Sequence, residues 1–159
     1  MHQRTLEETR TLRMINKMYE AKHSGGATLL VYSEEILANG DPKLNYFAAQ
    51  ILGVNFAEHL EKVLEANVLH WYHMGLELCI DMKQLDNATK YSFVVRFYEK
   101  ILQHDNLYVL YKTTEAMENE GIFSEYLSSK PNSQYYKKLY AEKIRSLPSA
   151  FDVMLRKTR

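Results

Sequence analysis

The 159-residue sequence has a single cysteine, Cys79, and no apolar run near the roughly 20 residues that a membrane-spanning helix needs. One cysteine excludes an internal disulfide framework and suits a reducing compartment. The N-terminal residues MHQRTLEETR lack the apolar core of a signal peptide. From these absences we expect a soluble, cytoplasmic protein that does not associate with membranes.

Motifs of catalysis and cofactor binding are also scarce. The turn Ser24-Gly25-Gly26 lacks the Gly-Lys-Ser/Thr ending of a phosphate-binding loop, and no Ser/His/Asp arrangement or carboxylate pair can be argued from spacing. Cys79 falls on an apolar helical arc with no base near it in sequence, which is typical of a core thiol. The sequence therefore predicts no cofactor and favours a non-enzymatic protein.

What the chain does have is the composition of one globular domain. Its hydrophobic fraction of 46% and charged fraction of 25% are ordinary for folded proteins and exclude disorder as the main state. Its length suits one domain with its own core. We therefore expect a single all-helical domain over residues 1–159, with basic helices over 130–159.

Helical periodicity and capping residues recur along the whole chain. The clearest case is 41–53, where Asp41 suits the N-cap, Pro42 the first turn and Gly53 the C-terminal stop. Residues 27–32, ATLLVY, also have some strand character. The pattern predicts an all-α fold of about eight to ten short antiparallel helices, stacked like an α-solenoid or closed into a compact bundle. The expected helices are 5–22, 27–38, 42–52, one starting at Asn55 with Glu58 completing a capping box, 67–83, one capped by Asp86, 107–119, 122–128, 133–147 and a last one from Pro148.

The apolar stripes of these helices predict the core. The residues expected there are Leu44, Phe47, Ile51, Trp71, Leu78, Val94, Tyr98 and Ile101.

Two segments resemble known helical repeats. The segment 40–53, GDPKLNYFAAQILG, resembles the first helix of a HEAT-type repeat in its Asp-Pro start, its paired alanines and its closing Leu-Gly. Residues 71–75, WYHMG, followed by 97–102, FYEKIL, are similar to a tetratricopeptide repeat. Both resemblances imply stacked helical hairpins, which present extended surfaces to protein partners.

A narrow polar stripe on the helix expected over 67–83 allows two interpretations. His70, His73 and Glu77 share one face at spacings of three and four, so they could hold a metal ion, with His59 supplying a further ligand. The other interpretation is an ordinary water-facing edge, in which a His–Glu pair at i, i+4 makes a surface contact. The His-Glu-x-x-His signature of metal helices is absent, which favours the second.

Charge is balanced overall but unevenly placed. The chain has 20 basic and 20 acidic residues, yet residues 130–159 carry a net charge of +6 and the first 129 carry −6. The basic segment also contains several of the chain's 12 tyrosines, and tyrosine suits surfaces that are both wet and adhesive. Candidate interaction residues in this segment are Tyr135, Tyr136, Lys137, Lys138, Tyr140 and Arg145.

These features favour a protein–protein interaction module, a small regulator, inhibitor or assembly subunit that presents a Tyr-rich helical surface. The alternative is a nucleic-acid-binding subunit of a ribonucleoprotein complex, because lysines interleaved with aromatic residues suit phosphates and bases. The apolar arc of the same helix, which includes Tyr135 and Leu139, points instead to packing against the protein body. A metal-binding helical protein is the third interpretation.

Overall fold

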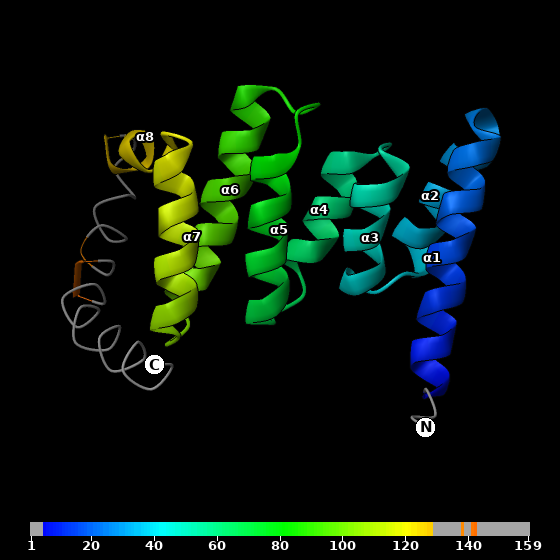
Figure 1. The fold of residues 1–159 in the computed structure, drawn as a ribbon, viewed down its shortest axis with the longest axis horizontal. Coiled ribbons are helices and arrows are strands. Elements are labelled where there is room, and N and C mark those ends of the chain that lie inside the picture. The colour runs from blue at the N-terminus through cyan, green and yellow to red at the C-terminus, as the bar shows by residue number, and fades with distance from the viewer. Residues whose placement is uncertain (1–4, 129–137, 139–140, 143–159) are drawn as a thin grey trace, which may run out of the picture. The chain divides into compact units, whose positions relative to one another are not determined.

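The computed structural model describes residues 5–128, 138 and 141–142, and within these residues the chain forms eight α-helices and no strand (Figure 1). Helices hold 83% of the described residues, so the all-α prediction is confirmed. None of the described helices is both long and apolar enough to cross a lipid bilayer. The helices are α1 (Leu6–Ser24), α2 (Gly26–Asn39), α3 (Pro42–Leu52), α4 (Phe56–Leu64), α5 (Leu69–Asp81), α6 (Asn87–Leu102), α7 (Leu107–Asn119) and α8 (Ile122–Ser128).

Capping side chains explain where four of the eight described helices begin, namely α1, α3, α6 and α7. The Asp41 side chain accepts a hydrogen bond from the Leu44 amide at 2.8 Å, and Gly53 closes α3 in the left-handed conformation. Thr5 opens α1 with a complete capping box. The predicted bounds of α3, α7 and α8 are confirmed. The strand-like segment 27–32 lies wholly within α2, so its helical assignment is also confirmed.

One predicted capping box and one predicted helix start are wrong. Asn55 does precede α4, but its side chain makes no cap hydrogen bond, and the capping box with Glu58 does not form. The side-chain amide of Asn55 instead donates a hydrogen bond to the hydroxyl of Ser33 on α2, which is distant in sequence. The fifth helix spans Leu69–Asp81, so it begins two residues after the predicted Asn67, whose left-handed φ of 54° places it in the preceding turn.

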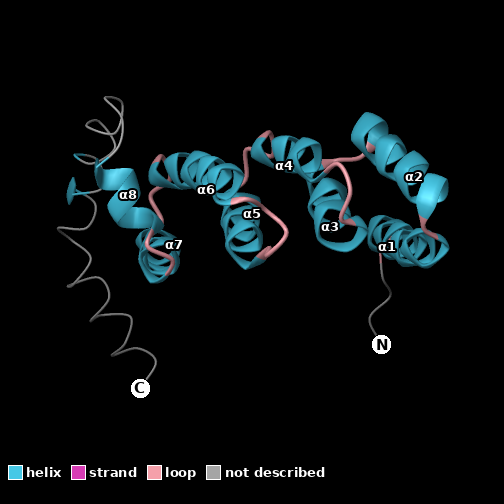
Figure 2. Cartoon of the chain, turned by 90° about the horizontal axis from the view of Figure 1, so that it is seen from above, coloured by secondary structure: helices cyan, strands magenta, loops and turns pink. Residues whose placement is uncertain are grey.

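The chain divides into two compact units, Met1–Trp71 and Tyr72–Arg159, and the division falls inside α5. In the first unit α1 and α3 lie in one row, and α2 and α4 lie in the other (Figure 2). Gly25 and Gly26 both have positive φ, which lets α1 and α2 join through a very short turn. One buried apolar cluster of this unit consists of Met18, Ala21, Ile36, Ala48, Ile51 and Leu52, and α4 adds the buried residues Leu60, Val63 and Leu64.

In the second unit α5 and α7 lie in one row and α6 in the other (Figure 2). Tyr98 on α6 is fully buried, and its hydroxyl lies 2.8 Å from the hydroxyl of Thr114 on α7. Its ring makes edge contacts with the rings of Phe123 and Tyr126, which belong to α8. Tyr98 therefore connects three helices of this unit, and α8 is held by aromatic packing.

The core prediction is confirmed in part. Ile51, Leu78, Val94, Tyr98 and Ile101 are buried. Leu44, Phe47 and Trp71 were expected in the core but are half-buried. Leu44 and Phe47 pack against the edge of the first unit's core, and Phe47 also lines a hollow between α1 and α3. The stripe on α3 is thus wider than the surface that its neighbours cover.

Gly75 on α5 is required by close packing in the second unit. A Cβ atom at this position would lie 2.5 Å from Cζ of Phe97, whose side chain is fully buried and can move only by disturbing its packed neighbours. We expect Gly75→Ala to lower the free energy of unfolding by about 1–3 kcal/mol, because overpacking outweighs the gain of about 0.5–1 kcal/mol in helix propensity. Urea denaturation measures this change.

The control is the same substitution in a Phe97→Leu background, where the shorter side chain removes the clash. Gly75→Ala should cost less in that background, as a double-mutant cycle would reveal. A Gly75→Ala protein as stable as the parent would show that the contact is not limiting.

Candidate functional site

A fully buried polar network joins three helices of the first unit. His59 on α4 uses both of its ring nitrogens. Its Nε2 lies 2.7 Å from the hydroxyl oxygen of Ser33 on α2, and its Nδ1 lies 2.8 Å from Oδ1 of Asn45 on α3. Ser33, Asn45 and His59 each have 0% exposed surface. Sequence reasoning missed this network, although each member falls on the buried arc of its helix, a few residues from apolar core residues.

The hydrogen bonds of the network fix its protons. The Asn45 amide nitrogen donates to the carbonyls of Asp41 at 2.9 Å and Gly40 at 3.3 Å, so its oxygen faces His59. That oxygen can only accept, so Nδ1 of His59 carries the proton and Nε2 accepts from the Ser33 hydroxyl. The Asn55 amide then donates to Ser33 at 3.0 Å. Each of these hydrogen bonds in the network therefore pairs a donor with an acceptor.

The connectivity Ser33–His59–Asn45 is that of a nucleophile, a base and an orienting residue. A substrate cannot reach it, because all three side chains are completely buried and none of them lines either hollow described below. Burial lowers the pKa of His59 from 6.5 to about 4, against a smaller opposite effect of Glu58. His59 is thus neutral near pH 7, and we interpret the network as structural.

The predicted metal stripe lies only partly at the surface of α5, because His73 is half-buried and its Nδ1 is buried without a hydrogen-bond partner among the described residues. His70 is exposed and packs edge-on against Trp71, with ring centroids 4.8 Å apart, while Nε2 of His73 lies 3.4 Å from Oε1 of Glu77. His59 uses both ring nitrogens in the buried network. In the part of the chain that the structure describes, no three His, Cys, Asp or Glu side chains converge as metal ligands. The His73–Glu77 contact is the i, i+4 pair that the second interpretation predicted.

Cys79 is a core residue, as its place on the apolar arc predicted. Its side chain is fully buried, and burial raises the pKa of the thiol to about 12, although Lys90 acts in the opposite direction. A thiol with this pKa is almost entirely protonated near neutral pH and is a poor nucleophile.

The interaction residues predicted in the C-terminal segment lie outside the described residues, with one exception. Lys138 is described, and it is helical and exposed. Tyr135, Tyr136, Lys137, Tyr140 and Arg145 are not described, so the predictions for them stay predictions.

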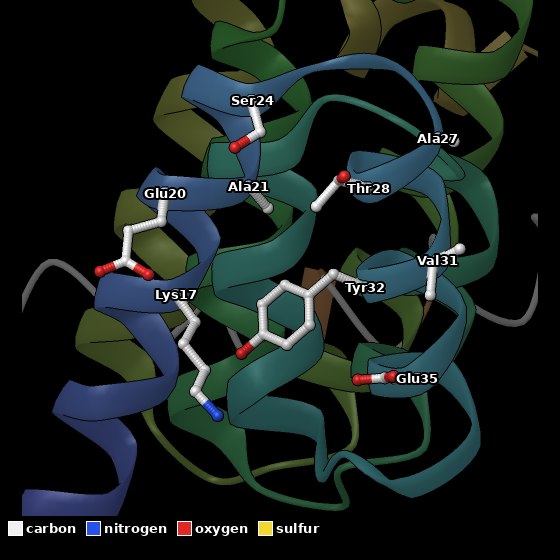
Figure 3. A pocket seen from close by; sticks show the side chains of 9 residues that line it. All are labelled: Lys17, Glu20, Ala21, Ser24, Ala27, Thr28, Val31, Tyr32 and Glu35. Atoms are coloured by element: carbon white, nitrogen blue, oxygen red, sulfur yellow. The ribbon is translucent and has the colours of Figure 1, made fainter.

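A groove of about 580 Å³ runs between α1 and α2 (Figure 3). The Tyr32 ring lies between the two helices, and its hydroxyl donates to the Met14 carbonyl at 3.1 Å. Burial is the main cause that raises the pKa of Tyr32, with a smaller contribution from Glu35. The residues that line the groove are Lys17, Glu20, Ala21 and Ser24 from α1, and Ala27, Thr28, Val31, Tyr32 and Glu35 from α2.

A smaller hollow of about 320 Å³ lies between α1 and α3. It is lined by Glu8, Thr11, Leu12, Ile15, Lys43 and Phe47. On a helical wheel at about 100° per residue, Leu12 and Ile15 lie on one flank of α1, and the groove residues Lys17 and Glu20 lie on the other. The larger groove is therefore on the side of α1 that faces away from α3.

Comparison of the chain with protein-family models, curated proteins and solved structures found no match.

The buried network makes the stability of the protein depend on pH. The unfolded chain protonates His59 near pH 6.5, whereas the folded chain resists protonation until about pH 4. The unfolded state binds more protons in this range, so the free energy of unfolding should fall as the pH is lowered. We expect His59 to account for about 2–3 kcal/mol of the loss between pH 7 and pH 4.

Urea denaturation of the parent and of His59→Gln at several pH values in this range measures the effect. The variant should lose stability less steeply, whereas His70→Gln, which replaces an exposed histidine, should follow the parent curve. Equal pH dependence in the parent and His59→Gln would contradict the assigned role of His59.

Proposed function

We propose that the protein is a protein–protein interaction module that docks a partner in the groove between α1 and α2. The observation that carries this proposal is the uncovered apolar surface of α2. This helix buries only Ser33 and Ile36, while Leu30 and Val31 are 47% and 54% exposed. Val31 lines the groove, so a partner that docks there would remove its exposed aliphatic side chain from water.

The dimensions of the groove support docking. Its volume of about 580 Å³ is within the range of about 300–1,000 Å³ that binding pockets have. Ala21, Ala27 and Val31 supply apolar contacts, while Ser24 and Thr28 supply hydroxyl groups. A mixture of apolar contacts and a few polar groups is common where proteins bind one another.

The groove is also preorganised. Tyr32 is tied to the backbone of α1 by its hydrogen bond to Met14, and Ser33, the next residue, is held by His59. Both bonds fix α2 against its neighbours, so α2 loses little further conformational freedom when a partner binds. Lower ordering costs favour affinity for a given buried area.

The test is the substitution Val31→Asp, which places a charge on the exposed apolar surface without disturbing the core. We expect the affinity for partners to fall at least about tenfold, because an unpaired carboxylate would be desolvated at the centre of the interface. Stability should change by no more than about 0.5 kcal/mol. The measurement compares the proteins captured from the native cell extract by each variant, followed by titration of the captured partner.

Val68→Asp is the matched control. Val68 is 48% exposed, similar to Val31, but it is not among the residues that line the groove. Partners lost with Val31→Asp and kept with Val68→Asp would support the proposal. Capture that is the same for both variants and the parent would contradict it.

A further inference from the structure

We infer that the groove between α1 and α2 takes a basic amphipathic helix of the partner protein. This inference rests on the proposed function and adds the chemistry of the ligand. It is carried by three features of the groove: its uncovered side, its small side chains and its unpaired carboxylates.

The groove faces away from the rest of the first unit. The opposite flank of α1 faces α3, and no described residue covers the flank that carries Lys17, Glu20 and Ser24. Two antiparallel helices leave a furrow between them that a third helix can fill with its ridge of side chains. The groove therefore offers the place that a further packed helix would take.

The floor of the groove allows close approach. Ala21, Ser24, Ala27 and Thr28 are small, and they come from both helices near the hairpin turn (Figure 3). Small side chains let a third helix lie close to both neighbours and bury its larger apolar residues against Val31 and Tyr32. An incoming helix with apolar residues at i, i+3 and i+4 matches this floor.

The charge of the groove selects the polar side of the incoming helix. Glu20 and Glu35 line it, and Glu34 is exposed next to it on α2, which contains no lysine or arginine. Lys17 is the single basic residue among the lining side chains. Within residues 5–128 none of the three carboxylates takes part in an ion pair. Lysine or arginine residues that flank the apolar stripe of the partner would complement these carboxylates.

The experiment is a selection of peptides from a random display library, with peptides of about 14–18 residues, long enough for a helix of several turns. The full chain serves as bait, and binders that also bind Val31→Asp are discarded. We expect the selected peptides to be rich in lysine or arginine next to apolar residues at helical spacing. The same selection on the Glu20→Lys, Glu35→Lys double variant should yield acidic peptides instead.

A basic peptide selected on the parent should bind the double variant at least about tenfold more weakly. Glu115→Lys is the matched control, because it reverses the charge of an exposed side chain on α7 that does not line the groove. This variant should bind the peptide as the parent does.

Each outcome separates the inference from the proposed function. Peptides that need Val31 but show no basic preference, or no helical spacing of apolar residues, would overturn the inference and leave the docking site standing. Selection of no peptide that depends on Val31 would overturn both.

Discussion

The hydrogen bonds of His59 hold the first unit together in a way that apolar packing alone cannot. Apolar contacts are not directional, so helices that pack only through them can slide along or rotate about one another. His59 accepts from Ser33 on α2 and donates to Asn45 on α3, and both bonds are shorter than 3 Å. Because an unpaired buried polar group is costly, any sliding of these helices would carry a large penalty. The network therefore fixes the register of α2, α3 and α4.

The same network determines how the chain enters α4. Asn55 has a left-handed φ of 50°, which is unusual for a residue other than glycine. Its side chain donates to Ser33, so the tertiary hydrogen bond offsets the local cost. The loop between α3 and α4 is thereby connected to α2, and the position of α2 controls the width of the groove that it forms with α1. A buried interaction and an exposed site are linked through one helix.

The sequence predicts well what depends on neighbours along the chain. Asp41, Pro42 and Gly53 define α3 from within its own segment, and its observed bounds are those expected. It predicts poorly what depends on distant residues. Ser33 and Asn45 are 26 and 14 residues from His59, and no spacing rule brings them together. Asn55 shows the conflict directly, because the local rule assigned it a cap and the tertiary partner took its side chain.

The groove could not be predicted from the sequence either, because the fold decides which side of α2 is covered. Residues 29–32, LLVY, are apolar on every side of α2, so periodicity cannot tell which of them the fold leaves in water. The structure covers Leu29 and Tyr32 in part and exposes Leu30 and Val31. This choice follows from Ser33 and Ile36, which must face α3 and α4 and so turn Val31 outward. Because Ser33 must face the buried network, Val31 is left at the surface of α2. A partner that covers Val31 would remove apolar surface from water, which favours binding.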